Sequence, residues 1–250
     1  MAHWNSIAER KLSKLTGKLR KARVDAFVNR LQLGPHDVVL DLGSEDGSYL
    51  ASHYPYPGNI VLADVREEPM KRGVERYGLK DYILLSVDGE IPAENGQFDA
   101  VWCNSCIEHV TVPRERLPHL SSRSFRAEAD AHQRRFAEEI CRVSKSYFVQ
   151  TPYLHFPVEA HSWLPGIQYV PLGGRLVFSR YCRTFWFKQW TPDFLLYGMQ
   201  RFKAHFPDAS EVRIEWAFGL PKSLIAVRRH GEGVLGRVAS EEQRRKTALG

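Results

Sequence analysis

The segment of residues 38–47 has the residue types best suited to binding a charged ligand. It places three carboxylates in or beside a turn that carries two glycines: Asp41, Glu45 and Asp46 with Gly43 and Gly47. The glycine spacing is G-x-x-x-G, which differs from the G-x-G-x-x-G pattern that cradles a pyrophosphate. Because carboxylates repel phosphates and attract cations, the segment predicts a ligand with a positive charge.

Two further carboxylates follow the next apolar runs along the chain. Asp64 ends the run 59–64 and lies 23 residues after Asp41, close to the separation at which a carboxylate holds both hydroxyls of a ribose. Asp88 and Gly89 follow the run 82–87 and could hydrogen-bond the edge of an adenine. A nucleoside with a cationic tail fits all three positions.

Two histidines are candidates for proton transfer. His109 follows the apolar run 98–103, and His161 lies in the aromatic segment 152–190. The ordinary pKa of histidine, about 6.5, allows either side chain to accept a proton from a substrate hydroxyl. Each also has a structural interpretation: His109 would cap the following turn, and His161 would pack against Trp163.

The sequence predicts no metal site. The chain has four cysteines: Cys103, Cys106, Cys141 and Cys182. The first two form a C-x-x-C, but a structural zinc would need a second pair at similar spacing, so buried inert thiols are favoured. Ligation of a divalent metal by His155, Glu159 and His161 was the alternative, but aromatic packing explains that segment without a metal.

An alternation of strands and helices must position these residues. The runs that predict strands are 38–42, 59–64, 82–87, 98–103 and 147–150, and helix-compatible segments are 69–77 and 125–143. Such alternation predicts parallel strands joined by right-handed crossovers. Only five residues separate the runs 211–218 and 224–228, and a link this short predicts an antiparallel hairpin.

We expect one domain over residues 1–230, followed by a flexible tail at 231–250. Residues 1–33 form a basic, amphipathic helical segment. Residues 152–190 are an aromatic insertion that we expect to cover the strand ends as a lid. Thr191, Pro192 and Asp193 resemble the start of a helix, with proline at its first position.

Composition excludes several classes of protein. Of 250 residues, 43% are hydrophobic and 26% are charged, which excludes wholesale disorder. No apolar run approaches the roughly 18 residues of a membrane helix, and residues 1–11 lack the core of a signal peptide, so we expect a cytoplasmic protein. The net charge of +6 and the basic residues between Arg10 and Arg23 leave an anionic surface partner open, beside a simple solvated helix face.

In this order and spacing, the motifs resemble those of the class I S-adenosylmethionine-dependent methyltransferases, and in particular the type 11 enzymes of a bacterial subgroup that acts on small molecules and sugars. Residues 41–47 match the first motif, Asp64 the ribose-binding acid, Asp88-Gly89 the adenine-edge motif, and 98–110 the fourth-strand motif. The resemblance implies a doubly wound, Rossmann-like α/β fold with a mostly parallel seven-stranded sheet, a C-terminal antiparallel hairpin and the aromatic lid. It also implies S-adenosylmethionine as the cofactor, held by Asp41, Gly43, Ser44, Glu45, Gly47, Asp64, Val65, Asp88, Gly89 and Asn104.

The expected reaction is methyl transfer to an oxygen, less readily a nitrogen, of a small molecule or glycan, with His161 and His109 as candidate catalytic residues. Alignment of the reactants alone could also suffice. One alternative is an RNA methyltransferase, which the basic N-terminal segment favours. Residues 104–107, however, read Asn-Ser-Cys-Ile rather than the Asn/Asp-Pro-Pro-aromatic of enzymes that methylate base amines. The other alternative is a non-catalytic binding protein that retains the cofactor fold.

Overall fold

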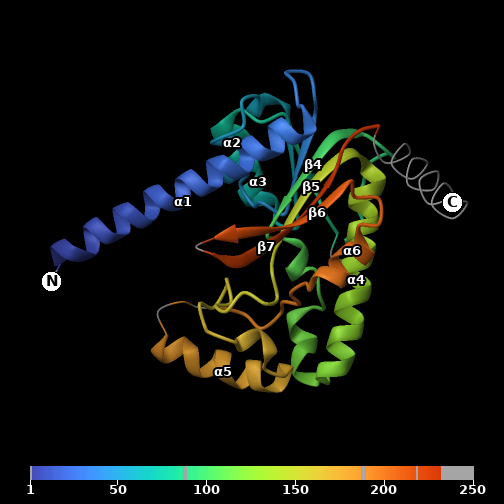
Figure 1. The fold of residues 1–250 in the computed structure, drawn as a ribbon. Helices are drawn as coiled ribbons and strands as arrows, with labels where there is room; N and C mark the ends of the chain where they lie inside the picture. Colours follow the sequence, from blue (N-terminus) through green and yellow to red (C-terminus); the bar gives the residue numbers. More distant parts are fainter. Residues whose placement is uncertain (1, 87–88, 187, 189, 218, 232–250) are drawn as a thin grey trace, which may run out of the picture.

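The fold is built on one mixed sheet (Figure 1). The structure is a computed structural model that describes residues 2–86, 89–186, 188, 190–217 and 219–231. Within these residues the sheet has seven strands in the order β3-β2-β1-β4-β5-β7-β6. The strands are β1 (Val39–Leu42), β2 (Ile60–Asp64), β3 (Asp81–Leu84), β4 (Phe98–Asn104), β5 (Ser144–Pro152), β6 (Glu211–Ala217) and β7 (Leu220–Arg228).

Strand pairing confirms the predicted fold class. The first five strands are parallel, and β7 is antiparallel to both β5 and β6. In the register of the sheet, Leu42 at the end of β1 lies opposite Ala63 of β2 and Cys103 of β4. The carboxyl ends of these three strands therefore lie level with one another, so the residues that follow them meet at one edge.

Helices cover both faces of the sheet. They are α1 (Ala2–Leu31), α2 (Ser48–Ala51), α3 (Glu67–Tyr77), α4 (Ser122–Val143), α5 (Leu172–Phe185) and α6 (Met199–His205), with short 3-10 turns η1 (Pro57–Asn59), η2 (Ile107–His109), η3 (Arg114–His119) and η4 (Ile167–Tyr169). Buried residues of α4 and α6 share one core with the strands, and buried residues of α1, α2 and α3 share the other. The alternation within β1 follows from this: Leu40 and Leu42 face the first core and Val39 faces the second.

Two elements differ from the sequence prediction. The helix expected after Thr191 is wrong: that stretch is extended, and α6 begins only at Met199. The i to i−4 hydrogen bond of a helix capped by Thr191 is not formed, because Leu195 N donates to the Glu108 carbonyl instead. The lid (residues 152–190), which reads as irregular in sequence, contains the 14-residue helix α5, far below the sheet in Figure 1.

Several of the described basic side chains in the C-terminal half of α1 have partners within the chain. Lys21 pairs with Asp25, and Arg20 lies over the ring of Tyr49. The expected contact of this helix with an anionic surface stays a prediction, and the tail at 232–250 lies outside the described residues. Among the described residues, no helix is both long enough and apolar enough to cross a membrane.

Candidate active site

The carboxylate of Asp41, at the sheet edge in β1, is fully buried. Its Oδ1 accepts a hydrogen bond from the Ser44 hydroxyl, while its Oδ2 is buried without a partner in the described chain. Burial raises the pKa of Asp41 to about 7, against the opposing effect of the Ser44 hydrogen bond, and the nearby carboxylates of Asp64 and Asp46 raise it further. A cation beside Oδ2 would favour the ionised form.

Glycines shape the turn after β1. Gly43 and Gly47 both have positive φ, at 75° and 66°, a conformation that side-chain-bearing residues rarely adopt. A Cβ at Gly43 would lie only 2.1 Å from Cys106 Sγ. The loop after β1 is therefore packed directly against the loop after β4, which leads into His109.

This packing predicts a large stability loss for Gly43→Ala. Backbone strain and the clash with Cys106 together should lower the free energy of unfolding by about 2–5 kcal/mol, measured by urea unfolding. Gly78→Ala is the matched control, because Gly78 has φ of 63° but open space around its Cβ position. It should lose only the strain part, about 1–2 kcal/mol. Equal losses in the two variants would contradict the close packing of the two loops.

Asp64 lies at the end of β2, where its carboxylate organises the surrounding backbone. Oδ2 accepts from Glu45 N at 3.1 Å and Oδ1 accepts from Arg66 N at 3.0 Å. The Arg66 guanidinium lies 3.6 Å from Oδ1 and pairs with Glu45 at 2.5 Å. Sequence reasoning missed Arg66, which holds the first-motif loop to the end of β2. The predicted Val65 is 57% exposed here, so its apolar side chain is free to contact a ligand.

The remaining predicted cofactor residues lie at neighbouring strand ends. Asp88 lies outside the described residues, whereas Gly89 adopts φ of 82°. Asn104 ends β4, and its Oδ1 accepts a hydrogen bond from Arg23 Nη1 of α1 at 2.8 Å. Arg23 in turn pairs with Glu215 of β6 at 2.5 Å. Sequence reasoning had placed Arg23 on the solvated face of the basic segment, but it links α1, the end of β4 and the terminal hairpin.

The structure brings the two predicted histidines together. His109 Nε2 lies 2.9 Å from His161 Nε2, so the rings share a hydrogen bond although 52 residues separate them in the chain. Behind His161, Nδ1 lies 2.6 Å from Glu159 Oε1, and that carboxylate also accepts from the His161 and Ser162 backbone N–H groups. His109 is therefore more than a turn cap, and His161 stacks on Phe194, at 5.7 Å between ring centroids.

A second buried carboxylate, that of Glu108, faces the histidine pair. Its Oε2 accepts from the Thr151 hydroxyl at 2.9 Å, and its Oε1, 3.6 Å from His161 Nε2, has no hydrogen-bond partner in the described chain. Burial lowers the pKa of His161, but Glu108 and Glu159 outweigh burial and raise it to about 9. Burial lowers the pKa of His109. At neutral pH the pair therefore consists of a cationic His161 donating to a neutral His109.

The same side chains could also hold a divalent cation. One ligand atom each from Glu108, His109 and His161 lies within 4.8 Å of the others. The metal ligand set considered from sequence, with His155, is not the one that gathers here. His155 instead lies 3.1 Å from the Tyr169 hydroxyl, within the lid.

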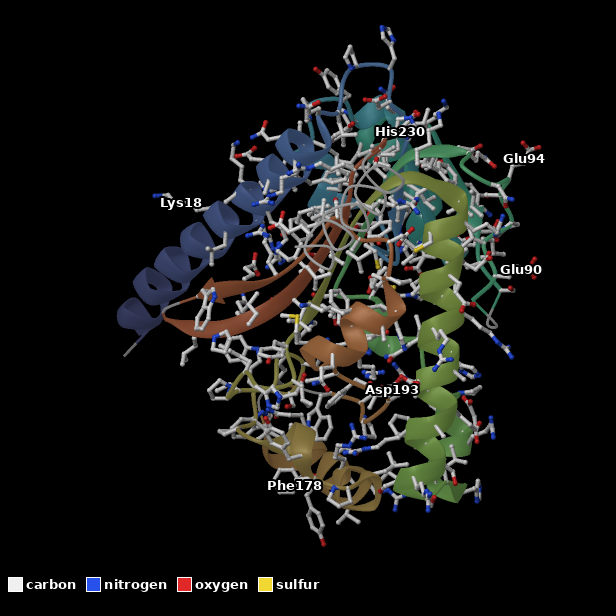
Figure 2. The ribbon with its side chains drawn as sticks, turned by 45° about the vertical axis from the view of Figure 1, so that its right-hand side comes forward. Lys18, Glu90, Glu94, Phe178, Asp193 and His230 are labelled. Atoms are coloured by element: carbon white, nitrogen blue, oxygen red, sulfur yellow. The ribbon has the colours of Figure 1, made fainter. Side chains whose placement is uncertain are left out.

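Beside this site, the lid and its neighbours enclose a cavity of about 860 Å³. Its walls come from the start and the middle of the lid (residues 153–155 and 168–175), the first turns of α4, and residues 194–201, which run into α6. Figure 2 shows Asp193, just before that segment, beside α4, and Phe178 on α5 at the far end of the lid from the sheet. Phe194 forms a wall of the cavity and also stacks on His161, so the cavity and the histidine pair are neighbours.

Comparisons with known proteins agree with this architecture. Residues 40–147 match a family model described as a methyltransferase domain. A SAM-dependent methyltransferase from Methanosarcina mazei is similar in structure, with 11% identity, a TM-score of 0.51, and coverage of 80% of this chain and 95% of that chain. The YcgJ protein from Bacillus subtilis matches with 11% identity, a TM-score of 0.50, and coverage of 83% and 98%. Comparison with curated proteins gives no match.

Proposed function

We propose that this chain, whose residues 40–147 form a methyltransferase domain of the class I S-adenosylmethionine-dependent family, methylates an oxygen atom of a small molecule or glycan. Methyl transfer and the cofactor follow from the family. The choice of oxygen, the acceptor class and the roles of the site residues are the proposal. The observation that carries it is the facing pair His109 and His161 with buried carboxylates behind His161.

The residues at the strand ends fit the cofactor. The buried Oδ2 of Asp41 lacks a donor in the described chain, and the ammonium group of the methionine part would supply one. Gly43 and Gly47 allow the loop after β1 to take its positive-φ turn beside the strand ends. Asp64 would accept from the ribose hydroxyls, and Val65 would contact the adenine. When bound, the cofactor supplies a methyl group on a positively charged sulfur.

In this proposal His161 receives the proton that the acceptor hydroxyl loses. Glu159 fixes the ring through Nδ1, which leaves Nε2 as the basic atom. Glu108 and Glu159 stabilise the imidazolium that results, because both carboxylates are buried, where charges interact strongly. In the free site Nε2 is hydrogen-bonded to the His109 ring, and the acceptor hydroxyl would take the place of that ring at Nε2 when it binds. A base placed in this way suits a hydroxyl, which cannot be methylated without losing its proton.

The pKa of His161 predicts a pH dependence. Only the neutral ring can accept a proton, so turnover should rise with pH up to about 9, the folded-state pKa of His161. Glu159→Gln removes a negative neighbour that raises this pKa, so the rising limb should move to lower pH by about one unit. The measurement is the pH profile of kcat/KM for both proteins. If kcat/KM of the wild type instead rose below pH 6.5, the base would be His109, whose pKa is lowered.

Metal chelation distinguishes proton transfer by His161 from a mechanism that uses a bound metal ion. We expect turnover to survive dialysis against EDTA, because the proposed proton transfer uses only the imidazoles and carboxylates of the chain. Added Mg²⁺, Mn²⁺ or Zn²⁺ should not raise the rate. Loss of turnover on chelation, with recovery on adding one of these ions, would show that Glu108, His109 and His161 act as metal ligands.

Labelled methyl transfer tests the acceptor class. The protein is incubated with cofactor carrying a 13C-methyl group and either a small-molecule extract or bulk RNA, and the product is read by NMR. We expect a methoxy signal from the small-molecule fraction. An N-methyl signal, or labelled RNA, would contradict the proposal. Lys21 and Arg23, two basic residues of the segment that suggested RNA, already pair with Asp25 and Glu215.

A further inference from the structure

The cavity beside the histidine pair is strongly basic. The arginines in its walls are Arg123, Arg126, Arg175 and Arg201. The acidic residue in these walls, Asp130, is already used, since Arg201 Nη1 donates to Asp130 at 3.0 Å and to the Gln133 side chain at 2.6 Å. The other three arginines have no ion pair with any described carboxylate. Positive charge in this cavity is therefore in excess.

Arg175 is the unusual member of this set because it is buried without a direct ion pair. The carboxylates of Glu159 and Asp193 attract it only at longer range. It is only 6% exposed, and its guanidinium lies over the rings of Phe125 and Phe194, at 5.4 and 4.9 Å. Nη1 donates to the Phe194 carbonyl at 3.0 Å, whereas Nε is buried without an acceptor in the described chain. A buried charge without a partner is costly, and proteins seldom keep one unless something compensates it.

An unmatched acceptor lies in the same walls. Gln168 is nearly buried, and its Nε2 donates to the carbonyls of Leu154 and Phe156. Its Oε1 has no donor in the described chain. The walls of the cavity thus carry an unpaired cationic donor, Arg175, and an unpaired neutral acceptor, Gln168 Oε1. A ligand that carries both an oxyanion and hydroxyl groups has the complementary chemistry.

We propose that this cavity binds an oxyanion, a carboxylate or a phosphate, on a polyhydroxylated methyl acceptor, with Arg175 as the buried anchor. Arg123 and Arg126, both exposed, add long-range attraction for the anion. The ring of Phe194 joins the two parts of the site, since Arg175 and His161 both lie against it. A hydroxyl of the same molecule would then lie at the histidine pair. Identifying the ligand as the acceptor rests on the proposed function, whereas anion binding does not.

Binding of defined probes tests the proposal. The full chain, saturated with S-adenosylhomocysteine, is titrated by calorimetry with glucose, glucuronate and glucose 6-phosphate. We expect at least one charged sugar to bind about tenfold more tightly than glucose, because a hydrogen-bonded charge adds that much. Whichever of the two charged sugars binds more tightly identifies the natural oxyanion as a carboxylate or as a phosphate. Equal affinity for the three sugars, or no binding of either charged sugar at about 10 mM, would overturn the proposal.

Variants locate the binding in this cavity. Arg175→Lys should weaken binding of the charged sugar about tenfold. Arg126→Gln should weaken it about threefold, and because Arg126 is exposed, this substitution should not affect folding. Arg180→Gln is the matched control, since Arg180 is an exposed arginine that lies on α5, as Arg175 does, but does not line the cavity. Unchanged affinity in both cavity variants, or an equal loss in Arg180→Gln, would overturn the assignment. No turnover is needed, so this test and that of methyl transfer can fail separately.

Discussion

His161→Ala should lower methyl-transfer turnover by about 10²-fold or more while leaving the affinity for S-adenosylhomocysteine unchanged. The expected loss is large because the substitution removes both the proton acceptor and the ring that the buried Glu108 and Glu159 polarise. Cofactor affinity should not change, because the residues proposed to hold the cofactor lie at the strand ends, in other loops. The measurement combines kcat from a labelled-methyl assay with a calorimetric dissociation constant.

Controls make this result specific. His119→Ala removes an exposed histidine of η3 that is not part of the site, and it should keep wild-type turnover. Circular dichroism would verify that the His161 variant is folded, since its ring also supports the lid through Phe194. Full activity of His161→Ala, together with a strong loss of activity in His109→Ala, would identify His109 of η2 as the base. If both variants were fully active, alignment of the reactants alone would drive the reaction.

Asp64→Ala should weaken S-adenosylhomocysteine binding by roughly 2–4 kcal/mol, about 30- to 1000-fold. The carboxylate would lose charge-assisted hydrogen bonds to the ribose hydroxyls. It would also lose the two bonds that hold Glu45 N and Arg66 N, and with them the ordered loop after β1. The measurement is calorimetric titration of the folded variant.

The control for this variant is Asp81→Ala, which removes an exposed carboxylate at the opposite end of the neighbouring strand β3. The affinity of Asp81→Ala for S-adenosylhomocysteine should equal that of the wild type. Asp88→Ala should show a smaller loss than Asp64→Ala, because backbone groups near Gly89 share the adenine contact. Affinity of Asp64→Ala within twofold of wild type would contradict the ribose assignment.

The parallel strands and the sheet-edge carboxylates could be predicted because their signals are local. Short apolar runs bounded by glycine and proline identify the buried parallel strands, and Asp41 and Asp64 follow from their positions at strand ends. The helix α5 could not be found in this way. Gly173 and Gly174 in its first turn disfavour a helix, and its buried face contains Arg175 and Ser179 beside Leu172 and Cys182.

The constellation around His161 depends on contacts between distant segments. Sequence reasoning proposed His109 and His161 separately, but their pairing requires the lid to fold back onto η2, which brings Glu108 and Glu159 with it. Arg23 was missed for a similar reason. A charged residue on a basic helix reads as solvated, and its partner Glu215 lies 192 residues away in the chain.

A single calorimetric titration of the wild-type protein with S-adenosylhomocysteine tests the central claim most directly, because methyl transfer depends on a cofactor held at the ends of β1, β2 and β4. We predict one binding site per chain with a dissociation constant on the order of 10 µM. Absence of binding to the folded protein at about 1 mM ligand would contradict the account and favour a binding protein that retains the fold without the chemistry.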